Sequence, residues 1–176
     1  MATHENCNRT MSKTERYKTL FGQIKALVAD EDDLVANMAN VAAMLHHEFG
    51  FWWTGFYRVC TIPETGKEML VLGPFQGPLA CSRIACGKGV CGTAWAKANT
   101  VIVPDVDRFP GHIACDSASN SEIVVPIHVN GRIWGVLDID SPEKNRFSEE
   151  DKKGLEQFVR LLEESVDWRK ASLDSL

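Results

Sequence analysis

The spacing of apolar positions divides the chain into a helical beginning, a strand-rich middle and a helical end. Between residues 12 and 50 apolar residues recur every three or four positions, as in amphipathic helices. Ser12 and Glu15 have the spacing of a capping box and mark the start of a first helix. The acidic run DEDD at 30–33 suits the positive end of a second helix, which we expect Gly50 to end. The apolar positions of these helices are Leu20, Ile24, Leu27, Val28, Leu34, Met38, Val41 and Leu45.

After residue 50 the pattern becomes typical of strands, with aromatic and β-branched residues bounded by glycine and proline. Asn130-Gly131 separates the last two apolar runs and predicts a hairpin with a type I′ turn. The expected strands are FWWTGFYRV (51–59), EMLVLGPF (68–75), LACSRI (79–84), TVIVPDV (100–106), EIVVPIHV (122–129) and RIWGVLDIDS (132–141).

Two further helices complete the predicted elements. Segment 86–99 begins with glycines and continues with helix formers, so we expect a loop that leads into a short helix. FSEED at 147–151 caps a long final helix. This order lacks the βαβ alternation of a parallel sheet. It predicts an α+β fold: a disordered tail over 1–11 and one domain over 12–170, with a central antiparallel sheet and helices packed on one face.

Charge and length exclude several classes of function. The chain has 176 residues and a net charge of -5, without a basic cluster, which argues against binding to nucleic acid or to an anionic membrane surface. It contains neither an apolar run long enough to span a bilayer nor, in its first sixteen residues, a secretory signal. We therefore expect one cytoplasmic domain in a reducing compartment.

The six cysteines do not form a familiar framework. A chain of this length without an export signal does not need a disulfide scaffold. No C-x-x-C pair is present, and the spacing disfavours zinc. Redox chemistry, nucleophilic chemistry and plain free thiols remain open. The cysteines are Cys7, Cys60, Cys81, Cys86, Cys91 and Cys115.

Two long irregular connections, 85–93 and 104–121, carry three of these cysteines. Their glycines do not match a phosphate-binding loop. Cys115 lies in the polar stretch GHIACDSASNSE, close to His112. A nucleophilic thiolate needs exposure and a nearby donor or cation. From spacing alone, Cys115 is either a nucleophile or a loop thiol without a role. His112 either assists Cys115 or only caps a turn.

Carboxylates gather at the predicted hairpin. Asp138 and Asp140 alternate along one strand and so point to one face, and antiparallel pairing brings Glu122 close to 139–140. Buried carboxylates need partners. They are either solvated residues at the end of a strand, a pocket for an ammonium group, or a proton store for catalysis.

Five segments together resemble the free methionine-(R)-sulfoxide reductase family, which is built on a GAF domain. The resemblance extends over about residues 12–166. It implies a six-stranded antiparallel sheet flanked by helices, and reduction of free methionine sulfoxide of the R configuration at sulfur. The segments are GFYRV, LGPFQG, CSRIACGKGVCGTAWA, FPGHIACDSASNSEIVVPI and GVLDIDSP.

The resemblance also implies residue roles. Cys115 attacks the sulfoxide, Cys81 resolves the product, and Cys91 has an accessory role. Trp53 and Tyr57 match the family's aromatic contacts to substrate. Glu122, Asp138 and Asp140 then become the acidic pocket, with Glu122 and one of the two aspartates as candidate proton donors. No metal or cofactor is implied, the electrons come from a thioredoxin-type protein, and homodimers are common.

Two other functions compete with this interpretation. A non-catalytic GAF module can bind a small ligand as a sensor, and a metal-regulated binding protein can use the same cysteines. A sensor does not need three matched cysteines, which favours the reductase.

Overall fold

The computed structural model describes residues 11–113 and 117–165. Its sheet has six strands in the order β3-β2-β1-β6-β5-β4, and every neighbouring pair is antiparallel. This confirms the predicted α+β fold. The expected tail over 1–11 and the expected end of the domain at 170 lie almost entirely outside the described residues. The elements are α1 (Lys13–Val28), α2 (Leu34–Phe49), β1 (Trp53–Ile62), β2 (Lys67–Gln76), β3 (Arg83–Ala85), α3 (Gly89–Lys97), β4 (Val101–Val103), a 3-10 turn (Val106–Arg108), β5 (Ser121–Val129), β6 (Arg132–Ser141) and α4 (Glu149–Ser165).

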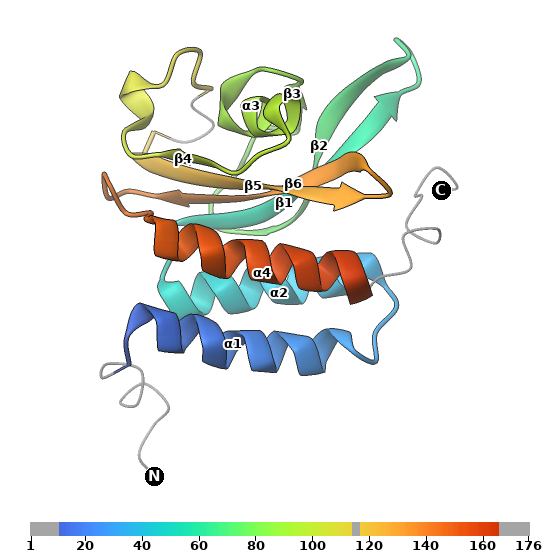
Figure 1. Ribbon diagram of the computed structural model, residues 1–176. Helices are drawn as coiled ribbons and strands as arrows, with labels where there is room; N and C mark the ends of the chain where they lie inside the picture. Colours follow the sequence, from blue (N-terminus) through green and yellow to red (C-terminus); the bar gives the residue numbers. More distant parts are fainter. Residues whose placement is uncertain (1–10, 114–116, 166–176) are drawn as a thin grey trace.

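The helices cover both faces of the sheet, so the expectation of helices on one face is wrong in part. In Figure 1, α2 and α4 lie against one face with α1 as an outer layer, and α3 lies on the opposite face. The reason is visible in the central strands, which bury residues on both of their faces. Along β5, seven successive residues from Ser121 to Ile127 are buried. A second apolar face needs a cover, and α3 with its flanking loops provides it.

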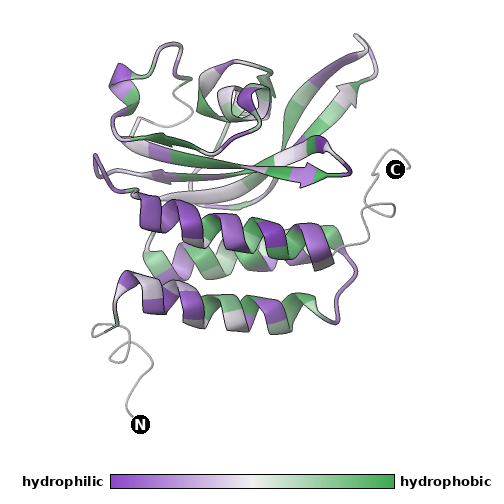
Figure 2. Cartoon of the chain, viewed as in Figure 1, coloured by the Kyte–Doolittle hydropathy of each residue, from purple (hydrophilic) through white to green (hydrophobic). Residues whose placement is uncertain are grey.

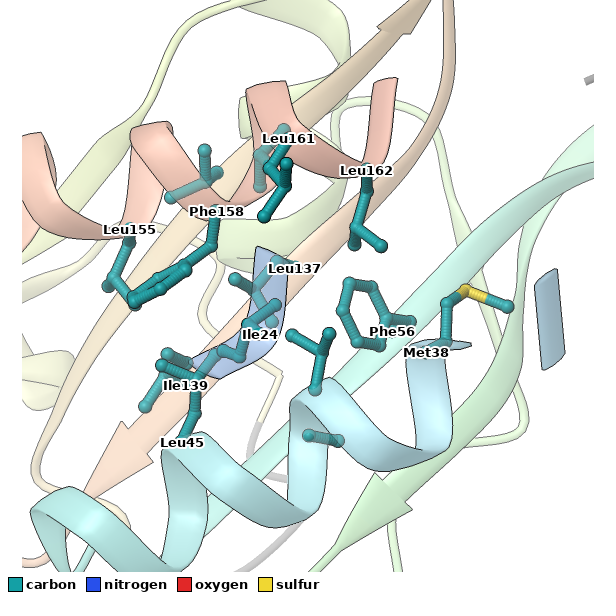
Figure 3. Close-up of a cluster of buried hydrophobic side chains, with 14 of the residues drawn as sticks. Ile24, Met38, Leu45, Phe56, Leu137, Ile139, Leu155, Phe158, Leu161 and Leu162 are labelled. Carbon is teal, nitrogen blue, oxygen red and sulfur yellow. The ribbon is translucent and has the colours of Figure 1, made fainter. Parts of the chain in front are cut away.

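The larger core lies between the sheet and the helices α1, α2 and α4. Figure 3 shows Phe56, Leu137 and Ile139 of the sheet facing Leu155 and other side chains of the helices. Polar residues occupy the outward sides of the same helices (Figure 2). Period-two alternation sends the neighbouring residues of β1, β5 and β6 to the α3 face. The second, smaller core on that face includes Trp53, Tyr57, Val90, Cys91, Val124 and Val136.

The predicted helix and turn signals are confirmed. The Ser12 hydroxyl accepts from the Glu15 amide, and the Glu15 carboxylate accepts from the Ser12 amide. Gly50 ends α2 in the left-handed region at φ 64°. Asn130 and Gly131 have φ of 51° and 77°, as a type I′ turn requires.

Two of the boundaries that differ from the prediction bear on the site. The expected third strand over 79–84 is confined to β3, because its first residues leave the sheet and pass over the α3 face. The expected loop over 85–93 ends early, since α3 begins at Gly89. Cys91 therefore lies in the first turn of a helix. Within the described residues, every helix is too short or too polar to cross a bilayer.

Glycine at position 154 of α4 makes room for Tyr17 of α1. A Cβ at this position would lie 2.4 Å from the Tyr17 ring, which stacks on Phe49 and whose hydroxyl donates to buried Asp151. We expect Gly154→Ala to lower the free energy of unfolding by about 1–3 kcal/mol, measured by urea denaturation. Gly22→Ala is the matched control on α1, because a Cβ there meets no atom within 4 Å. It should leave stability unchanged or raise it by up to about 1 kcal/mol. Equal effects of the two substitutions would contradict this packing role.

Candidate functional site

A cavity opens on the face of the sheet that α3 covers. It encloses about 520 Å³, its open mouth included. Strands β1, β5 and β6 form its floor, the first turn of α3 forms one wall, and the segments before β3 and after the 3-10 turn form the rim. The lining residues are Trp53, Tyr57, Leu79, Ala80, Ile84, Gly89, Val90, Cys91, His112, Ile113, Ser119, Glu122, Asp138 and Asp140.

The strand register brings the three carboxylates together. Glu122 of β5 pairs with Asp140 of β6, as the hairpin predicts, and Asp140 also pairs with Trp53 of β1. Asp138 lies two positions from Asp140 on the same face. Because β1, β6 and β5 are the central strands of the sheet, the acidic floor is fixed by backbone hydrogen bonds on both sides.

Burial raises the pKa of two carboxyl groups of this acidic floor. Glu122 and Asp138 are each 6% exposed. Desolvation, followed by the charges of Asp138 and Asp140, holds the pKa of Glu122 well above its usual value. Desolvation also raises the pKa of Asp138, to about 6. The environment of Glu122 therefore favours the protonated form of its carboxyl group more than solvent does.

One carboxylate oxygen of the cavity-lining residues is buried without a hydrogen-bond partner. Asp138 Oδ1 is buried and accepts no hydrogen bond from any described residue. Such an oxygen carries a desolvation cost that a bound donor or cation would relieve. The cavity floor therefore has the character of a site for a positively charged or hydrogen-bond-donating group.

Cys91 adds a buried thiol to the same wall. Its side chain is 2% exposed, and its Sγ lies 3.9 Å from Glu122 Oε1. Burial, followed by the charges of Asp138 and Glu122, raises the pKa of Cys91 well above its usual value. The group is therefore a neutral thiol, which donates a weak hydrogen bond and is a poor nucleophile in this environment.

The two aromatic residues of β1 hold the segment that carries Cys81. Trp53 Nε1 donates to the Pro78 carbonyl at 3.1 Å, and the Tyr57 hydroxyl donates to the Cys81 carbonyl at 3.0 Å. The rings of Trp53 and Tyr57 are stacked with centroids 6.0 Å apart. These contacts fix Cys81 at the edge of the cavity.

The described cysteines differ in oxidation state. Cys81 is disulfide-bonded, and its partner is outside the described residues. Cys60, Cys86 and Cys91 are free thiols. Cys115 also lies outside the described residues, so its predicted role as nucleophile stays a prediction, although Ile113 and Ser119 on either side of it line the cavity.

His112 closes a turn and also lines the cavity, while its assistance to Cys115 stays a prediction. Its backbone amide donates to the Phe109 carbonyl and closes a turn. Its ring lines the cavity, with Nε2 3.8 Å from Glu122 Oε2. Burial lowers the pKa of His112. The lowered pKa of His112 and the raised pKa of Glu122 both disfavour an ion pair between the two side chains.

Comparisons with known proteins agree with this geometry. A GAF domain matches residues 33–166. A free methionine-R-sulfoxide reductase of Escherichia coli is 47% identical over 91% of this chain and 96% of its own length, and one of Saccharomyces cerevisiae is 40% identical over 93% of each. The solved structure of free methionine-R-sulfoxide reductase from Neisseria meningitidis, in complex with its substrate, is 51% identical and covers 89% of this chain and 91% of its own, with a TM-score of 0.84.

The chain belongs to the free methionine-R-sulfoxide reductase family of GAF-domain proteins. The resemblance found in the sequence motifs is thereby confirmed. The roles of individual residues stay predictions.

In this member of the reductase family, sequence reasoning found the carboxylates and aromatic residues of the cavity but missed most of its rim. Leu79, Ala80 and Ile113 line the mouth. Leu79 is 87% exposed. No periodic pattern marks these positions, because they come from irregular segments that only the fold brings together.

Substitution of Glu122 tests the protonation of the buried pair. With its folded pKa raised above the unfolded value, Glu122 binds its proton more tightly in the folded protein, so its contribution to stability is lost as pH rises. Glutamine at this position does not titrate. We expect the melting temperature of Glu122→Gln, relative to the unsubstituted protein, to rise by on the order of a few degrees between about pH 5 and about pH 8.

Glu64→Gln in the exposed turn between β1 and β2 is the control for this measurement. Its melting temperature relative to the unsubstituted protein should not depend on pH. A difference for Glu122→Gln that is flat or falls with pH would contradict a raised pKa at Glu122.

Proposed function

We propose that this protein reduces free L-methionine-(R)-S-oxide to L-methionine with its own cysteine thiols. One observation carries this proposal: in a chain of this family, a single cavity joins a carboxyl group of raised pKa, an unpartnered carboxylate oxygen and an aromatic wall, with a disulfide-bonded cysteine at its edge. Relatives bear this activity in their names, and the related structure from Neisseria meningitidis is a complex with substrate.

The cavity suits a small zwitterion. The substrate ammonium group would pair with the carboxylates of Asp138 and Asp140. The substrate carboxylate would accept from backbone amides at Gly89 and Val90, because the first amides of a helix have no acceptor within the helix. The indole face of Trp53 would pack against the S-methyl group. These contacts together recognise both charged ends of a free amino acid.

The reduction step needs a nucleophile and a proton donor. The Cys115 thiolate attacks the sulfoxide sulfur, and Glu122 delivers a proton to the oxygen. An S–S bond forms between Cys115 and the substrate while the S–O bond breaks, and the oxygen takes a second proton from solvent and leaves as water. A water molecule then attacks the Cys115 sulfur, the S–S bond breaks and one proton returns to solvent, so methionine departs as a thioether and Cys115 is left as a sulfenic acid. A neutral carboxyl next to the reacting oxygen is a better proton donor than an ionised one, so the raised pKa of Glu122 suits this role.

The second step regenerates the thiols. The Cys81 thiol attacks the Cys115 sulfenic acid, water leaves, and a disulfide forms between the two residues. A thioredoxin-type protein in a reducing compartment then reduces this disulfide. The disulfide-bonded state of Cys81 and the free thiols at Cys60, Cys86 and Cys91 support this division of roles.

Substitution of the two redox cysteines separates attack from resolution. Cys115→Ser should abolish reduction of free methionine-(R)-sulfoxide, with a loss of on the order of 10³-fold or more. Cys81→Ser should release about one methionine per chain and then stall, since the sulfenic acid has no internal partner. Cys60→Ser is the control and should turn over normally in a thioredoxin-coupled assay. Sustained turnover by Cys115→Ser would refute the assignment and favour a GAF module that only binds its ligand.

The substrate form provides an independent test. We expect the R epimer of free methionine sulfoxide to be reduced, and a peptide with an internal methionine sulfoxide to be poorer by on the order of 10²-fold or more in kcat/KM. A peptide lacks the ammonium group that the buried carboxylates are proposed to bind, which leaves those carboxylates unpaired. Equal rates on the free and peptide-bound sulfoxides would count against recognition of the ammonium group.

A further inference from the structure

Three donor atoms from three different elements converge at the floor of the cavity. Cys91 Sγ comes from α3, a carboxylate oxygen of Glu122 from β5, and one of Asp138 from β6. These atoms all lie within 4.8 Å of one another, and all three side chains are buried. One soft thiol and two hard carboxylates form a donor set that borderline-soft divalent ions accept, whereas Mg²⁺ and Ca²⁺ prefer oxygen alone.

The spacing of these donors is close to that of a tetrahedral zinc site. Bonds of about 2.3 Å to sulfur and about 2.1 Å to oxygen place the two ligand atoms about 3.6 Å apart at a tetrahedral angle. The Cys91 Sγ to Glu122 Oε1 distance is 3.9 Å and the three donor atoms lie within 4.8 Å of one another, so an ion among them requires movements of a few tenths of an ångström to about 1 Å. Side-chain torsions of the three residues can supply these movements without a change in the backbone.

A second observation indicates that this cluster is built to receive a cation. Asp138 Oδ1 is buried in the cavity floor and has no hydrogen-bond partner among the described residues. We propose that Cys91, Glu122 and Asp138 bind one thiophilic divalent cation, Zn²⁺ in the first instance, and that this ion excludes the substrate. The fourth ligand position faces the cavity, where a water molecule or the ring of His112 completes the tetrahedron, since His112 Nε2 lies 3.8 Å from Glu122 Oε2.

Binding of the ion involves loss of protons and no redox change. The Cys91 S–H bond breaks, its proton passes to solvent, and the thiolate forms the bond to the metal. Any proton on Glu122 is released in the same way. The ion occupies the oxygen atoms that the proposed function assigns to the substrate ammonium group and to proton delivery. The competition with substrate therefore rests on the proposed function, whereas the metal binding does not.

The binding itself is tested with Cd²⁺, whose bond to a thiolate gives an ultraviolet charge-transfer band. Titration of the disulfide-bonded protein should give one Cd²⁺ per chain with this band, and Zn²⁺ should displace it. Cys91→Ser should abolish the band and weaken Zn²⁺ binding, measured by equilibrium dialysis, at least tenfold. Cys60→Ser and Cys86→Ser are matched controls at the other described free thiols and should change neither quantity. A band that survives in Cys91→Ser, or the absence of stoichiometric binding, overturns the site.

The exclusion of substrate is tested in the disulfide-bonded protein without a reductant, which cannot consume the substrate. Free methionine-(R)-sulfoxide should lower the intensity of the Cd²⁺ band in a concentration-dependent manner. The S epimer should lower it less at the same concentration. If Cd²⁺ binds through Cys91 but the band is insensitive to the sulfoxide, the inhibitory part of the proposal is wrong. Turnover measured with a metal chelator present tests the reductase function separately, so failure of one proposal does not imply failure of the other.

Discussion

The burial of two carboxyl groups side by side is the constraint on which the site depends. Glu122 and Asp138 are both almost fully buried, and the charge of Asp138 adds to desolvation in disfavouring the ionisation of Glu122. A buried polar group without a partner costs roughly 1–3 kcal/mol, and a buried charge costs more. The pair is tolerated because it lies on adjacent central strands whose opposite faces pack into the larger core. The same crowding that destabilises the fold leaves a proton available in the cavity.

The two faces of the sheet have different roles: one packs in the larger core, and the other forms the floor of the cavity. The sheet packs against the helices of the larger core through Phe56, Leu137 and Ile139. Residues next to these along the same strands line the cavity. A strand that alternates in this way cannot shift by one residue without moving the carboxylates into the apolar core. The position of the acidic floor is therefore fixed by the packing of the opposite face.

Environment distinguishes the cysteines more clearly than spacing does. Cys91 is enclosed by carboxylates and stays protonated, which suits a hydrogen-bond donor or a metal ligand better than a resolving thiol. Cys81 lies at the rim, held by the hydroxyl of Tyr57 through its carbonyl group. Tyr57 thus connects the aromatic wall of the cavity with the segment that carries the disulfide-bonded cysteine.

Local signals in the sequence alone determined much of the secondary structure of this protein. Three of these signals depend only on neighbouring residues: the capping box at Ser12, the helix end at Gly50 and the Asn130-Gly131 hairpin. The helices and strands could therefore be predicted, and so could the pairing of Glu122 with Asp140. The long sequence motifs shared with the reductase family identified the family. Tertiary structure alone decided that α3 covers the second face and that Cys91 starts a helix within it. It also decided that the rim comes from irregular segments, because burial, pKa shifts and long-range contacts depend on residues far apart in the chain.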